Sequence, residues 1–137
     1  MSNQSTVLII DSSDETREVL KTALEYRGYS TRAASRAALG LEVARQVSPA
    51  IIVLSLEAPD SSDAAVSSGF RDHASTQKAS LVVIGSAKRD AKVFPQAEFV
   101  SAPYHFGPLI RRIEELSRAR AAGPADLDVK RSAPRAA

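Results

Sequence analysis

Residues 50–60, "AIIVLSLEAPD", join a short apolar run to a turn. Isoleucine, valine and leucine follow one another without polar alternation, which is typical of a strand that is covered on both faces. The run ends at Ser55, and Pro59 and Asp60 then favour a turn. The segment therefore predicts a buried strand of a parallel sheet, with a hydroxyl group at its carboxyl end.

The rest of the chain alternates between similar strands and helical patterns. Further strands are predicted at residues 6–10, 29–34, 80–86 and 98–100. Helices are predicted at residues 12–28, 35–47, 63–73 and 107–120. We expect Ser12 or Ser13 to cap the first helix and Ser35 the second. This order indicates an α/β fold with a parallel sheet and helices on both faces, whose ligand sites lie beyond the carboxyl ends of the strands.

Length and composition indicate one ordinary globular domain. The chain has 137 residues, of which 44% are hydrophobic and 25% charged, and it has no cysteine. Disulfides and thiolate chemistry are therefore excluded. The first residues lack a basic signal region, and no apolar run approaches the length of a membrane span. We expect a cytoplasmic protein that does not enter a membrane.

The basic charge is concentrated at the end of the chain. Residues 118–137 carry five basic and two acidic side chains, so their net charge is +3, and the remaining 117 residues carry −1. The sequence therefore does not predict a nucleic-acid-binding domain. We expect residues 1–118 to form the domain and residues 119–137 to be a basic, disordered tail.

Polar residues follow the predicted strands at one edge of the sheet. They are Asp11 and Ser12, Ser55 and Glu57, and Ser86, and the last strand is followed by Ala102 and Pro103. No histidine neighbours these serines, so no activated nucleophile and no catalytic residue is predicted. His73 and His105 are interpreted as surface or cap residues. A dinucleotide site is disfavoured because the first turn lacks its glycines.

The order and spacing of these strand ends resemble the receiver domains of two-component response regulators, the CheY-like family. The resemblance runs from about residue 6 to residue 118 and implies a flavodoxin-like, five-stranded sheet of order 2-1-3-4-5. In that family the corresponding positions hold an acidic pair (Asp11 and Ser12 here), the phosphoacceptor aspartate (Ser55), a Thr or Ser (Ser86) and a Lys-Pro pair (Ala102 and Pro103). The family's Lys-Pro bond is typically cis, so we expect a cis bond before Pro103.

The departures from the family define the functional hypothesis. Ser55 cannot form an acyl phosphate, Ser12 removes a Mg²⁺ ligand, and Ala102 removes the cation that holds the phosphoryl group. The sequence therefore predicts a pseudo-receiver with no cofactor and no enzymatic activity, which acts by protein contact. The resemblance implies a histidine kinase or a downstream regulator as partner, and leaves a homodimer open.

Several alternatives stay open. Glu57 lies two residues beyond Ser55 and could complete a weak metal site with Asp11. Ser55 could be the target of a serine kinase. The chain could also be a receiver that still binds phosphate, or a flavodoxin-like module that binds a small ligand.

The connection before the last strand is short for this family. Fifteen residues separate Ser86 from Ala102 and must include the strand at residues 98–100. We therefore expect the fourth helix of the family to be short, irregular or absent. The surface that this helix helps to build would then differ from that of other receivers.

Overall fold

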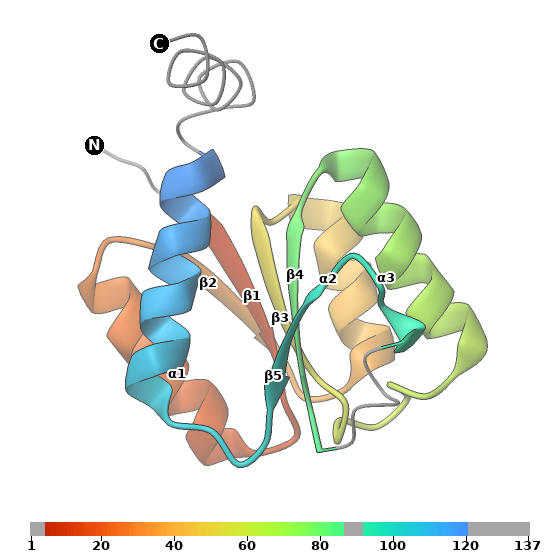
Figure 1. The fold of residues 1–137 in the computed structure, drawn as a ribbon, viewed down its shortest axis with the longest axis horizontal. Helices are drawn as coiled ribbons and strands as arrows, with labels where there is room; N and C mark the ends of the chain where they lie inside the picture. Colours follow the sequence, from red (N-terminus) through yellow and green to blue (C-terminus); the bar gives the residue numbers. More distant parts are fainter. Residues whose placement is uncertain (1–4, 87–91, 121–137) are drawn as a thin grey trace, which may run out of the picture.

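The computed structural model describes residues 5–86 and 92–120, which form a three-layered α/β fold (Figure 1). All strands are parallel and lie in the order β2-β1-β3-β4-β5. The strands are β1 (Thr6–Ile10), β2 (Ser30–Ala34), β3 (Ile51–Ser55), β4 (Ser80–Gly85) and β5 (Glu98–Ser101). The helices are α1 (Asp14–Tyr26), α2 (Ala37–Val47), α3 (Ala64–Gln77) and a C-terminal helix at residues 106–120.

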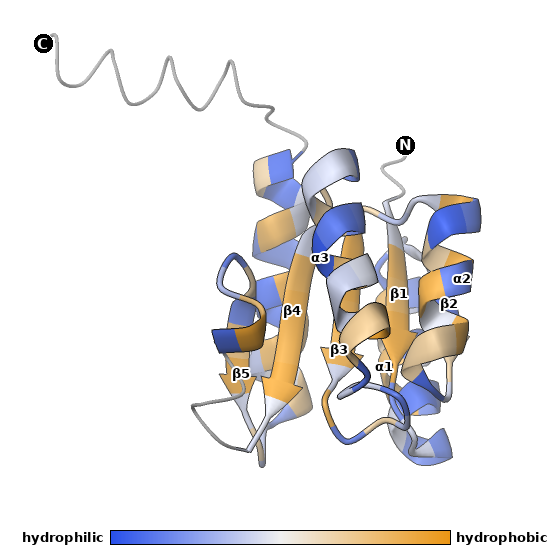
Figure 2. Cartoon of the chain, turned by 90° about the vertical axis from the view of Figure 1, so that its right-hand side faces the viewer, coloured by the Kyte–Doolittle hydropathy of each residue, from blue (hydrophilic) through white to orange (hydrophobic). Residues whose placement is uncertain are grey.

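The sheet separates two hydrophobic cores, because successive strand residues point to opposite faces. Val7 and Ile9 of β1 pack with α1 and the C-terminal helix, whereas Leu8 and Ile10 pack with α2 and α3. Figure 2 shows the resulting arrangement, with apolar central strands between helices that carry their polar faces outward. The continuous apolar runs in the sequence therefore correspond to strands covered on both sides, as predicted.

The ends of α1 follow from local chemistry. The hydroxyl of Ser13 accepts the backbone N–H of Thr16 at 3.1 Å, so Ser13 is the N-cap, in agreement with the prediction. Gly28 follows the helix with a φ of +98°, a conformation that favours glycine.

The predicted cap of α2 is wrong. Arg36, and not Ser35, is the N-cap residue, and no side chain caps this helix. The N–H of Ala37 instead donates to the carbonyl of Pro59 at 2.8 Å, so a contact with a distant loop replaces the local cap.

Helix α3 extends past its predicted end at residue 73 to Gln77. Ala74 continues its apolar face and packs against the core. The helix ends at Lys78, which adopts a left-handed conformation with a φ of 56°.

The connection from β4 to β5 is described only in part. Of its residues, the structure describes 86 and 92–97, where it shows a single short 3₁₀ turn followed by turns and no α-helix. Residues 87–91, where the fourth helix of the family is predicted to be short, irregular or absent, lie outside the described residues. The Ala102–Pro103 bond is cis, as predicted. The C-terminal helix continues through residues 119 and 120, and the remaining tail also lies outside the described residues.

None of the helices that the structure describes combines the length and the apolar character needed to cross a membrane.

Asp63 provides a test of the α3 cap. Its carboxylate accepts the N–H groups of Ala65 at 2.9 Å and Val66 at 3.1 Å. We expect Asp63→Ala to lower the free energy of unfolding by about 0.5–2 kcal/mol, because both donors lose their partner. Urea denaturation measures the change, and the exposed neighbour Ser62, which makes no such bond, gives the control Ser62→Ala. Equal effects of the two substitutions would contradict the capping role.

Candidate functional site at the carboxyl ends of the strands

The parallel strands bring the predicted site residues to one edge of the sheet. Ile10 pairs with Leu54, so Asp11 and Ser55 are the next residues on neighbouring strands. Ser55 is in turn opposite Ile84 of β4, and the N–H of Ala102 donates to the carbonyl of Gly85 at 2.8 Å. The other predicted residues follow directly: Ser12 and Ser86 are exposed, Ala102 is partly buried and Pro103 is exposed.

Asp11 is held in place by the turn that leads into α1. Its carboxylate accepts the backbone N–H of Ser13 at 2.8 Å. The guanidinium of Arg17 donates to the Asp11 carbonyl at 2.7 Å and also pairs with Asp14. The Asp-Ser-Ser sequence thus forms an Asx-type turn, which fixes the carboxylate of Asp11 at the end of β1.

Ser55 is an integral part of the buried sheet. Its side chain is only 6% exposed, and its hydroxyl accepts the backbone N–H of Glu57 at 3.3 Å. Glu57 itself is exposed. The loop beyond it is closed by Ser61, whose hydroxyl donates to the carbonyl of Leu56 at 2.6 Å. Ser55 is therefore a satisfied hydroxyl in the chain's own turn.

Two loops at this edge are tied together. The Nε of Arg36 donates to the carboxylate of Asp60 at 2.8 Å, beside the backbone bond from Ala37 to Pro59. Arg36 follows β2 and Asp60 follows β3, so the pair links loops that are 24 residues apart in the sequence. The positive charge of Arg36 is therefore paired with a carboxylate of the same chain.

Tyr104 is a site residue that the sequence analysis missed. Burial raises the pKa of its phenol, and the negative charge of Asp11 raises that pKa further. Its ring packs edge-on against Phe106 with centroids 5.7 Å apart. The signal in the sequence was its position directly after Pro103, at the end of the last strand. The phenol is thus a partly buried group whose pKa is raised by burial and, to a lesser extent, by the charge of Asp11.

Removing the Asp11 charge tests this arrangement. We expect Asp11→Asn to lower the pKa of Tyr104 without restoring its ordinary value, because the larger cause, burial, remains. Since the folded-state pKa is raised, the stability linked to Tyr104 is present below the ordinary tyrosine pKa and is lost as the pH rises through the raised value. NMR titration of the Tyr104 ring measures the shift.

Glu15→Gln is the control for this titration. Glu15 is an exposed carboxylate of α1 and does not contribute to the shifted pKa. An equal change in the Tyr104 pKa in both variants would show that general charge, and not proximity to Asp11, is responsible.

The two histidines do not activate any of the serines. His73 is partly buried in α3, where burial and the charge of Arg45 lower its pKa. His105 is exposed at the start of the C-terminal helix, and its carbonyl accepts the N–H of Leu109. Among the described residues, no hydrogen bond joins a histidine side chain to a serine hydroxyl.

The donor set at this edge is poor for a divalent metal. Within residues 5–86 and 92–120, no three or more histidine or acidic side chains gather where they could hold a metal ion. Asp11 already accepts a backbone N–H, Ser12 and Ser55 are neutral hydroxyls, and Glu57 is exposed. Among the described residues, one cavity lies against α3 and β5 and a smaller one against Leu56, and neither is lined by the predicted strand-end residues.

Solved structures of receiver domains share this fold. A CheY-like receiver domain protein from Methanospirillum hungatei JF-1 matches with a TM-score of 0.73 at 20% identity, covering 88% of this chain and 99% of its own. The chemotaxis response regulator CheY4 of Vibrio cholerae gives 0.71 at 15% identity, with 82% and 98% covered. A putative response regulator from Chloroflexus aurantiacus J-10-fl gives 0.70 at 18% identity, with 84% and 98% covered. No protein-family model and no curated protein matches the sequence. The chain therefore has the flavodoxin-like fold of CheY-like receiver domains, with the predicted strand order 2-1-3-4-5.

Proposed function

We propose that this chain is a receiver-like module of two-component signalling that works through protein contact and not through a phosphorylated aspartate. The shared fold supports the receiver part of the proposal. The strand-end residues support the second part, because Ser12, Ser55 and Ala102 differ from the side chains that the resemblance implies at these positions.

Ser55 is the observation that carries the proposal. It occupies the end of β3 and is buried, and its hydroxyl is already bonded to the N–H of Glu57. A serine hydroxyl is a weak nucleophile without a positioned base, and none is bonded to it among the described residues. A serine also cannot form the acyl phosphate that an aspartate forms.

The neighbouring groups support the same conclusion. Magnesium sites in proteins use one or two carboxylates with several waters. Here Asp11 is the acidic residue at the end of β1, Ser12 is neutral, and Ala102 offers no cation to a phosphoryl group. Glu57 as a second metal ligand remains the competing interpretation. The pocket residues in this proposal are Asp11, Ser12, Ser55, Ser86, Ala102 and Pro103, with no catalytic residue and no resident cofactor.

The proposed partner is a protein of the same signalling system, either a histidine kinase or a downstream regulator, in the cytoplasm. The near-neutral charge of residues 1–117 argues against nucleic acid as the partner of the folded part.

Treatment with acetyl phosphate and Mg²⁺, followed by intact mass spectrometry, tests the proposal. We expect the mass of the full chain to stay unchanged, while a receiver with an aspartate acceptor, treated in parallel, gains one phosphoryl group. A stoichiometric mass increase in this chain would overturn the loss of phosphotransfer. Magnesium-dependent quenching of tyrosine fluorescence, lost in Glu57→Gln, would instead support the metal site at Asp11 and Glu57.

A further inference from the structure

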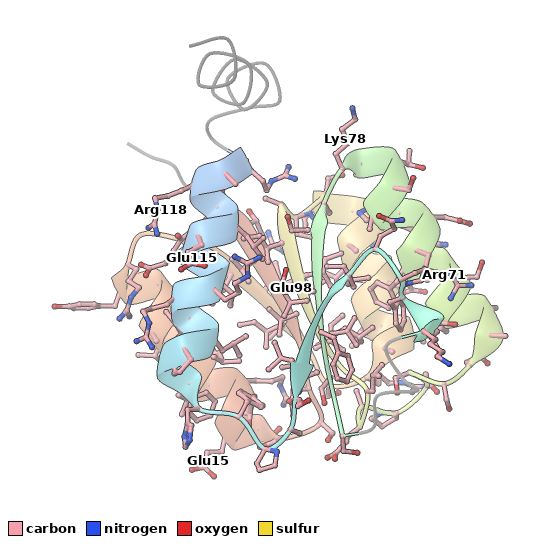
Figure 3. The ribbon with its side chains drawn as sticks, viewed as in Figure 1. Glu15, Arg71, Lys78, Glu98, Glu115 and Arg118 are labelled. Carbon is pink, nitrogen blue, oxygen red and sulfur yellow. The ribbon has the colours of Figure 1, made fainter. Side chains whose placement is uncertain are left out.

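A groove of about 510 Å³ lies between α3, the start of β4, the β4–β5 connection and the C-terminal helix. Its wall is mostly apolar and includes Leu81, Phe94 and Leu116. Arg71 of α3 and Glu98 of β5 add one charge of each sign (Figure 3), and the Glu98 carboxylate is already paired with Arg112 at 2.8 Å. None of the predicted strand-end residues lines this groove.

The described part of the β4–β5 connection forms one wall of this groove. This part, residues 92–97, contains no α-helix to lie over the sheet. Phe94 is 3% exposed and anchors the connection, and Arg71 donates to the carbonyl of Val93 at 2.9 Å. These contacts hold residues 93 and 94 of the connection against α3. Arg71 forms no ion pair with any residue that the structure describes.

The described part of the C-terminal helix reaches residue 120, close to this groove. Leu116 lines the groove, and Arg120 lies about one helical turn further on. The guanidinium of Arg120 donates to the carbonyl of Lys78, and the groove residues Ala79 and Ser80 follow Lys78 directly. In Figures 1 and 3 the end of the blue helix and Lys78 lie at the same end of the molecule. The following chain thus starts at the rim of the groove.

The sequence after residue 120 suits a return into the groove. Seventeen residues follow, and Gly123-Pro124 is a pair that favours a turn. Then comes "ADLDVK", residues 125–130, in which Leu127 and Val129 alternate with Asp126 and Asp128. In an extended segment the two apolar side chains share one face and the two carboxylates share the other. At about 3.3 Å per residue the segment has ample length to reverse and reach Phe94.

We propose that residues 125–130 dock in this groove of their own chain. Leu127 and Val129 occupy its apolar part. The carboxylates of Asp126 and Asp128 then lie on the outer face of the segment, where the partly exposed Arg71 side chain can reach one of them. The docked segment takes the place that a longer β4–β5 connection would cover. It makes the groove a surface that the chain itself occupies and that a partner must compete for.

Spin labelling of the full chain tests this proposal, and the absence of native cysteine makes the label unique. A nitroxide is attached to Ala125→Cys, and the amide signals of the labelled chain are compared before and after reduction of the nitroxide. We expect loss of the signals of Ala74, Leu81 and Ala97, which line the groove. Signals of Thr22, on the outward face of α1, should remain.

A second pair of variants separates docking from simple proximity to the helix end. Leu127→Ser with Val129→Ser, in the labelled chain, is expected to restore the groove signals. Ala133→Ser with Ala136→Ser, equally polar changes outside the segment, should leave the losses unchanged. Losses confined to residues near Arg120 in the labelled chain would overturn the proposal. Equal losses in an unlabelled, isotope-enriched chain mixed with the spin-labelled, unenriched chain would also overturn it, since a second copy would then be the occupant.

Discussion

Replacing Phe70 with alanine is expected to lower the free energy of unfolding by about 3–5 kcal/mol. Phe70 of α3 is fully buried and belongs to the core between the sheet and helices α2 and α3. Its removal takes a large apolar surface from that core and leaves a cavity that close-packed neighbours cannot fully fill. This loss is a large fraction of the stability of a small domain, about 5–15 kcal/mol. Urea denaturation followed by circular dichroism measures it.

Tyr26→Ala is the matched control, because it removes another aromatic ring from a helix. Tyr26 is 90% exposed at the end of α1, so we expect its removal to change stability by no more than about 0.5 kcal/mol. Similar losses for both variants would contradict the description of the α2–α3 core. A Phe70→Leu variant should recover most of the lost stability, because it refills much of the cavity with apolar atoms.

The architecture could be predicted from the sequence because its signals are local. Residues 51–54 and 81–84 are unbroken apolar runs, and such runs suit a strand that is buried on both faces. Ser13 and Gly28 mark the ends of α1 through chemistry that depends only on neighbouring residues. The strand order, in contrast, followed from the resemblance to receivers, since no local signal specifies it.

The errors in the fold arise where distant residues decide the local structure. Ser35 is a better cap by propensity than Arg36, yet α2 starts after Arg36 because Ala37 bonds to Pro59 and Arg36 pairs with Asp60. Neither contact has a counterpart in the sequence near α2. The extra turn of α3 has a similar origin. Ala74 packs against the core, and a single small apolar side chain in the sequence does not predict this burial.

The candidate site, like the fold, could be predicted only in part. The strand-end rule placed Asp11 and Ser55 on neighbouring strands, and the register agrees. It did not indicate that the charge of Asp11 would raise the pKa of Tyr104, because the two residues are 93 positions apart and their relative placement depends on the path of the chain after β5. Nor did it indicate the groove near Phe94, which exists because the β4–β5 connection folds back against α3.

Restoring the receiver side chains should produce the largest change in activity. The variant Ser12→Asp, Ser55→Asp and Ala102→Lys returns a second carboxylate, the acceptor and a cation to the strand ends. We expect this variant to gain one phosphoryl group from acetyl phosphate, dependent on Mg²⁺, where the original chain gains none. The reason is that carboxylates supply the ligands that magnesium prefers, and the lysine offsets the charge of the transferred group. Intact mass spectrometry with and without EDTA measures the gain.

The single change Ser55→Asp is the control for this variant. It supplies the acceptor but places a carboxylate at a position that is 6% exposed, without a new cation, so burial raises the pKa of that carboxyl group and the fold loses stability. We therefore expect little phosphorylation and a lower unfolding midpoint in urea for the single variant. The triple variant should recover part of that midpoint, because the ammonium group introduced by Ala102→Lys and the bound Mg²⁺ each offer the buried carboxylate an opposite charge.

These outcomes separate side-chain chemistry from backbone geometry. Phosphorylation of the triple variant alone would mean that the strand ends keep the spacing of a receiver and that three side chains account for the inactivity. Phosphorylation of Ser55→Asp to the same extent would mean that Ser12 and Ala102 do not limit the reaction. A folded triple variant that binds neither Mg²⁺ nor phosphate would place the cause in the loops, where Arg36 and Asp60 tie the edge together at 2.8 Å. Breaking that pair with Arg36→Gln in the triple variant would then be expected to open the edge and restore the reaction.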